Sequence, residues 1–94
     1  MAQLIKVNGE VTEVKPVNGK KFSLEELQKF VAGGGYIEKY RAGNKVFIWD
    51  ENGLNKRLPK NEKATDILYL ECEGMRNVQD IVGDVLICEK SECN

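Results

Sequence analysis

The sequence predicts a single α+β domain over residues 1–94, in which a small mixed or antiparallel sheet carries two helices in the order β-β-α-β-β-α-β. Three observations predict it. Asn-Gly pairs at positions 8, 18 and 52 suit tight turns with positive φ. One segment carries both a helix start signal and a helix stop signal, and short alternating or fully apolar runs lie between the turns. A chain of 94 residues has room for one hydrophobic core.

The first element is a predicted β-hairpin. An apolar run over residues 4–7 precedes Asn8-Gly9, and Val11 and Val14 alternate with polar residues after it. Because successive side chains of a strand point to opposite faces, this pattern predicts that one face of the hairpin is buried.

A helix over about residues 24–32 is predicted next. Ser23-Leu24-Glu25-Glu26 has the spacing of a capping box, in which the serine and the second glutamate each bond the other's backbone N–H. An apolar stripe with helical spacing follows and stops at Gly33-Gly34-Gly35. The glycine run has two interpretations. It ends the helix, or its missing side chains let a ligand approach and leave N–H groups for phosphate.

The second half is predicted to begin with another hairpin. Residues 36–40 alternate as a strand, and residues 46–49 read as a more fully buried strand after a turn at 42–44. Residues 54–60 are expected to be irregular, since Pro59 has no N–H for a ladder bond.

The segment over residues 62–72 fits two structures. Asn61 can cap a helix whose apolar face includes Ala64, Ile67 and Leu68, whereas Leu68, Leu70 and Cys72 alternate as in a strand. After a loop around Gly74, residues 81–88 form the last predicted strand, bent at Gly83.

The composition excludes several classes of protein. No segment approaches the roughly 18 apolar residues of a membrane span, and the start of the chain lacks a signal-peptide core. The chain has no histidine, and Cys72, Cys88 and Cys93 form no Cys-x-x-Cys pair. We therefore expect three free thiols, a reducing cytoplasm, and neither a metal site nor a cofactor.

The charges are unevenly distributed along the chain. Residues 1–65 hold twelve Lys and Arg against eight Asp and Glu, whereas residues 66–94 hold two against seven. This is either ordinary surface solvation, or a basic face for an anion with an acidic part that faces elsewhere or pairs with another subunit. A net charge of −1 disfavours binding to duplex nucleic acid.

The sequence offers no convincing catalytic residues. A serine or cysteine nucleophile needs a base, and of the two serines Ser23 is a helix cap and Ser91 lies near the end of the chain. The adjacent carboxylates Asp50 and Glu51 fit a solvated turn better than an acid–base pair. We therefore expect a binding protein and not an enzyme.

The segment over residues 55–63 is the best candidate for a binding site, because it concentrates four positive charges and two amides. Lys56 and Arg57 would neutralise a phosphate, and Asn55 and Asn61 would bond base edges or ribose hydroxyls. Tyr36 would stack on a base. The alternative is a solvated loop in which Asn61 is only a structural cap.

Several short motifs, in the same order along the chain, resemble a small family that is common in phages, prophages and mobile elements and is labelled only as a domain of unknown function. They are Gly-Gly-Tyr-Ile-Glu at 34–38, Asp-Glu-Asn-Gly at 50–53, Leu-Pro-x-Asn-x-x-Ala-Thr at 58–65 and Ile-Val-Gly-Asp-Val-Leu-Ile at 81–87. The run at 33–35 has one glycine more than the family's usual pair, so its loop geometry does not follow from the resemblance.

The chain is further similar to the anti-CBASS sponge proteins, with which phages trap the cyclic nucleotides of bacterial immune signalling. That resemblance implies a homo-oligomer, a dimer or tetramer, that sequesters a cyclic dinucleotide uncleaved in the cytoplasm of the infected host. A two-fold ligand would suit an interface between symmetric subunits.

A second hypothesis is a protein-interaction module that inhibits a host enzyme or acts as a phage regulatory subunit. Its contact surface would be the acidic part of the chain, as a partner site or a nucleic-acid mimic, with Glu71, Glu73, Asp80 and Asp84.

Overall fold

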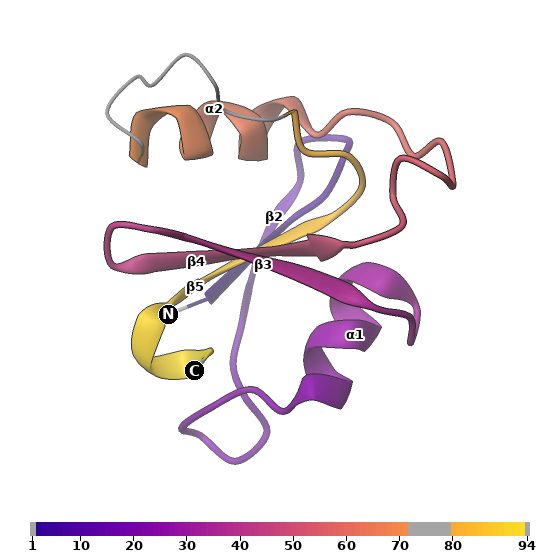
Figure 1. The fold of residues 1–94 in the computed structure, drawn as a ribbon. Helices are drawn as coiled ribbons and strands as arrows, with labels where there is room; N and C mark the ends of the chain where they lie inside the picture. Colours follow the sequence, from indigo (N-terminus) through magenta and orange to yellow (C-terminus); the bar gives the residue numbers. More distant parts are fainter. Residues whose placement is uncertain (1, 72–79, 94) are drawn as a thin grey trace.

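The computed structural model describes residues 2–71 and 80–93 and contains one antiparallel sheet with a helix on each face (Figure 1). The elements in chain order are β1 Ala2–Ile5, β2 Val11–Val14, α1 Leu24–Ala32, β3 Ile37–Ala42, β4 Lys45–Asp50, α2 Glu62–Glu71, β5 Val85–Glu89 and the short 3₁₀ turn η1 Lys90–Glu92. This confirms the predicted α+β class and the order β-β-α-β-β-α-β. Of the two sheet types expected, the antiparallel one is found.

The strands lie in the order β2-β1-β5-β4-β3, so the first and last strands of the chain are neighbours inside the sheet. β1 and β2 form the predicted hairpin, and β3 and β4 form the second hairpin. β5 joins them, because Ile87 lies opposite Gln3 of β1 on one side and Phe47 of β4 on the other.

The sheet separates two apolar cores. Residues directly opposite each other share a face, so Phe47 and Ile87 point toward α2, whereas Ile48 and Leu86 point toward α1. The α1-side core includes Ala2, Phe22, Leu27, Val31, Val46, Ile48, Leu86 and Cys88. The α2-side core includes Ile5, Phe47, Trp49, Ala64, Leu68, Ile81, Val85 and Ile87.

α1 begins and ends at the predicted signals. The Glu26 N–H donates to Ser23 Oγ at 3.2 Å, and Glu26 Oε1 accepts from the Ser23 N–H at 2.9 Å. The backbone N–H groups of Ser23 and Val17 lower the pKa of Glu26 below its usual 4.5. The carboxylate therefore contributes stability above that value, and the contribution is lost as the pH falls through the lowered pKa.

The glycine run ends α1. Gly33 adopts the left-handed conformation with φ 58°, the N–H groups of Gly33 and Gly34 donate to Gln28 O, and the Gly35 N–H donates to Ala32 O. These N–H groups are therefore used by the helix terminus, which confirms the first of the two interpretations.

Removing the cap hydroxyl tests this account of α1. We expect Ser23→Ala to lower the free energy of unfolding by about 1 kcal/mol, since the Glu26 N–H loses its acceptor at the helix start. Urea titration measures the change. Ser91→Ala, at an exposed serine of η1, is the control and should change stability by less than about 0.5 kcal/mol. Equal effects of the two substitutions would contradict the capping role.

The cysteine prediction was wrong in one respect, since Cys88 and Cys93 form a disulfide. The chain turns back through η1 after β5, so Cys93 returns to the α1-side core beside Cys88, and both residues are buried. The turn is anchored by the Phe22 N–H donating to Glu92 O at 2.8 Å and by Lys39 Nζ donating to Cys93 O at 3.3 Å. Cys72, like Glu73 and Gly74, lies outside the described residues.

Candidate functional site

The loop between β4 and α2 is a compact series of turns. Gly53, Lys56 and Leu58 donate their N–H groups to Asp50 O, Asn52 O and Gly53 O respectively. Arg57 adopts the left-handed region with φ 55°, which is uncommon for a residue with a Cβ. The expected irregular segment is thus an ordered surface loop, held in shape by its own backbone bonds.

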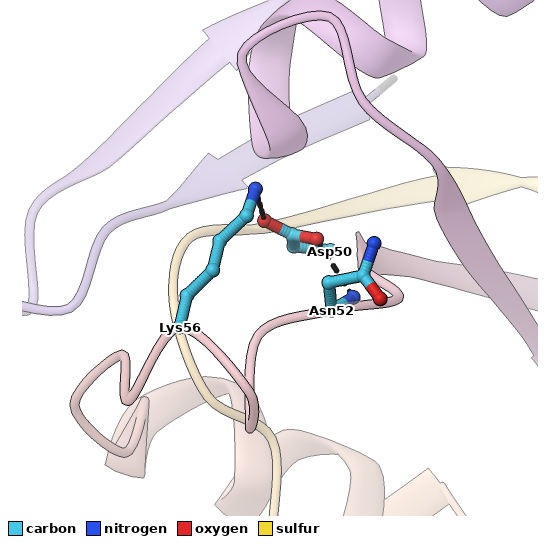
Figure 2. Close-up of polar contacts among 3 residues, drawn as sticks. All are labelled: Asp50, Asn52 and Lys56. Carbon is cyan, nitrogen blue, oxygen red and sulfur yellow. Dashed lines mark hydrogen bonds and ion pairs between the residues drawn. The ribbon is translucent and has the colours of Figure 1, made fainter.

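A buried carboxylate organises this loop (Figure 2). Asp50 ends β4 and is 3% exposed. Its Oδ1 accepts from the Asn52 N–H at 2.8 Å, and its Oδ2 accepts from Lys56 Nζ at 2.7 Å. Lys56 thus reaches from the loop back to the end of β4 (Figure 2). Its ammonium also lies near Gly35, in the segment between α1 and β3, where a side chain in place of the glycine would have its Cβ 4.0 Å from Lys56 Nζ.

A hollow of about 320 Å³ opens beside this ion pair, and we call it the Asp50 hollow. It lies between the end of α1, the β4–α2 loop and the segment that leads into β5. Its apolar lining comes from Val7, Val31, Ala32, Leu58 and Pro59, its polar lining from Asp50, Lys56 and Asp84, and Gly33 and Gly83 complete it. Asp84 is held in place because its Oδ1 accepts from the Val7 N–H at 3.2 Å.

The structure brings only some of the five predicted site residues together. Lys56 lines the Asp50 hollow, and Tyr36 follows Gly35 with 71% of its surface exposed. Asn55 and Arg57 are exposed on the same loop and do not line the hollow. Asn61 lies apart from this surface.

Asn61 is fully buried, and all its bonds are internal. Its Nδ2 donates to Ile5 O and Gly83 O, both at 2.9 Å, and its Oδ1 accepts from the Ala64 N–H at 3.0 Å. Both donors of the amide are therefore used inside the protein. Asn61 is therefore the structural cap of the alternative interpretation, and the prediction that it contacts a ligand was wrong.

The acidic residues named for the protein-partner hypothesis mostly have partners within the chain. Glu71 pairs with Lys45 at 3.4 Å and Asp80 pairs with Lys60 at 3.6 Å. The basic and acidic parts of the sequence thus meet in space, and both pairs are substantially exposed to solvent. They are therefore expected to contribute little to stability.

Two residues of the site were missed by the sequence interpretation. The sequence predicts a solvated turn residue at Asp50 and a surface charge at Asp84, yet both line the hollow. A signal existed for Asp50, since it directly follows the apolar run at 46–49 and belongs to the same strand. None existed for Asp84, whose position depends on contacts distant in sequence.

The described residues hold no group of three or more Asp, Glu or Cys side chains suited to a metal ion. Within residues 2–71 and 80–93, none of the helices is long and apolar enough to cross a membrane. Comparisons with protein-family models, with curated proteins and with solved structures gave no match.

Proposed function

We propose that this protein binds and sequesters an anionic nucleotide without cleaving it, and that the ligand is a cyclic dinucleotide trapped by a phage-encoded sponge. One observation carries the proposal. An exposed aromatic ring, Tyr36, follows Gly35 in the chain, and Lys56, whose ammonium lies near Gly35, lines the Asp50 hollow. The resemblance at residues 34–38 and 58–65 is what suggests that the nucleotide is cyclic.

The side chains suit such a ligand. A base stacked on an aromatic ring contributes about 1–3 kcal/mol, and Tyr36 offers a ring that the fold leaves 71% exposed. Arg57 can hold a phosphate with two parallel N–H donors, while the Asn55 amide can bond a ribose hydroxyl. Lys56, which lies beside Asp50, can contact the ligand in addition to Arg57 and Asn55.

Assembly is part of the proposal. A cyclic dinucleotide has two equivalent halves, and a two-fold axis between two copies of the chain would present the same loop to each half. The exposed Leu54, 69% accessible at the turn before Asn55, is available for contact with a second copy. The host cytoplasm is proposed as the compartment because the resemblance to the sponge proteins implies that the signal is trapped there.

Calorimetry against a panel of cyclic di- and trinucleotides tests the function. We expect one of them to bind with a Kd below 10 μM, about −7 kcal/mol, and to be recovered chemically unchanged. Arg57→Ala and Tyr36→Ala should each weaken binding at least tenfold. Lys20→Ala, at an exposed lysine between β2 and α1, should leave affinity unchanged. Absence of binding across the panel, or recovery of a linear product, would refute sequestration.

A further inference from the structure

The polar groups of the Asp50 hollow differ from those of the outer loop. Inside are two carboxylates against one ammonium, whereas Arg57 is exposed on the loop outside. Carboxylates accept hydrogen bonds and repel phosphate, so the interior favours a ligand group that carries N–H donors and no negative charge. The phosphates of a nucleotide would stay outside with Arg57, and another part of the ligand would enter.

The two carboxylates are fixed before any ligand arrives. Asp50 is 3% exposed and is held by the Asn52 N–H and by Lys56. Asp84 is held by the Val7 N–H through one oxygen. An ionised carboxylate has about four acceptor positions, so each keeps capacity for further donors. Pockets that bind small molecules specifically usually combine apolar walls with a few polar groups held in fixed positions.

The size of the hollow limits what enters it. At about 320 Å³ it is at the small end of ligand pockets, which run from about 300 to 1,000 Å³. One nucleobase with part of its sugar suits this volume better than a whole cyclic dinucleotide. The aliphatic lining from Val31, Leu58 and Pro59 would cover the flat face of such a base.

We propose that the Asp50 hollow is a guanine-selective base compartment, in which Asp50 and Asp84 accept the N1–H and N2–H donors and Lys56 donates to O6. Guanine presents these two donors side by side next to an acceptor, which complements two carboxylates and an ammonium. Adenine and cytosine each offer a single amino group on that edge. The inference rests on the proposed function and adds the base that it takes.

The test uses nucleosides without phosphate on the wild-type chain, followed by NMR. We expect guanosine to bind with a Kd below about 1 mM, and inosine, which lacks the N2 amino group, and adenosine to bind at least tenfold more weakly. Nuclear Overhauser contacts from the guanine H8 to the methyl groups of Val31 and Leu58 would place the base without any substitution. Equal binding of the three nucleosides, or no binding, would overturn the proposal.

Asp84→Asn is the informative variant. Its amide oxygen can still accept from the Val7 N–H, while the second acceptor atom becomes a donor that opposes the guanine donors. We expect at least a tenfold loss of guanosine affinity with an unchanged melting temperature. Asp66→Asn, on the exposed side of α2, is the matched control and should bind normally.

Three further outcomes separate this inference from the proposed function. Cyclic dinucleotides that bind with no preference for guanine would overturn the base compartment and leave sequestration standing. Guanosine that binds where cyclic dinucleotides do not would support the compartment and refute the sponge. Methylguanidinium that binds more tightly than guanosine would overturn the assignment to a base.

Discussion

Replacing Asn61 by alanine is expected to lower the free energy of unfolding by about 3–5 kcal/mol, because three buried hydrogen bonds are lost together. Ile5 O and Gly83 O lose a buried donor, and the Ala64 N–H loses the cap of α2. The amide ties β1, α2 and the segment before β5 to one another, so its loss affects three parts of the fold. Urea unfolding measured by circular dichroism gives the change.

The control for this substitution is Asn55→Ala, an exposed amide of the same loop, which should change stability by less than about 0.5 kcal/mol. Asn61→Asp is informative as well. It keeps the acceptor for the Ala64 N–H but replaces both donors by an oxygen that faces two carbonyl groups, so it should destabilise nearly as much as alanine. A cost below about 1 kcal/mol for Asn61→Ala would contradict the structural role.

The second large effect is expected at Phe47. Its side chain is fully buried in the α2-side core, and removing a buried aromatic ring costs about 3–5 kcal/mol through lost transfer energy and the cavity left behind. We expect Phe47→Ala to shift the urea midpoint by a corresponding amount without changing the slope of the transition.

The residue opposite Phe47 supplies the matched control. Tyr40 pairs with Phe47 across β3 and β4 but is 45% exposed on the edge strand, where its ring stacks on Trp49 at 6.3 Å between centroids. Tyr40→Ala should therefore cost less than half as much as Phe47→Ala. If both substitutions cost the same, the core beneath α2 is not packed as described.

The parts of the fold that depend on neighbouring residues could be predicted from the sequence. The capping box at Ser23 and the glycines after Ala32 set both ends of α1 through bonds within one turn. The hairpin at Asn8-Gly9 likewise follows from a turn type and a short alternating pattern. Such signals lie in consecutive residues, so no knowledge of the rest of the chain is needed to interpret them.

The choice between helix and strand at residues 62–71 depended on a contact distant in sequence. Leu68 and Leu70 alternate, which left a strand open, but the buried Asn61 caps the first turn and Leu68 packs on the sheet. Leu70 is 74% exposed, so the apparent alternation was not a buried face. The helix forms because its Ala64 and Leu68 side meets the α2-side core.

The site was predicted less well, for the same reason. The sequence identifies Lys56 by its charge, yet the position of its side chain is set by Asp50. The hollow exists only where the end of α1, the β4–α2 loop and Asp84 meet. Asn61 has the residue type of a ligand contact, and only its burial shows that it is a cap. The bond between Cys88 and Cys93 likewise follows from the path of η1 and not from their spacing.

The position of β5 in the sheet bears on how the chain folds during synthesis. β5 is synthesised after the other four strands of the described sheet, and yet it is the central strand that joins the β1–β2 hairpin to the β3–β4 hairpin. Isolated two-stranded hairpins are at best marginally stable in water. Neither hairpin therefore has a stable sheet to join until Val85–Glu89 has been synthesised, so formation of the sheet waits for β5, with long-range closure as its slow step.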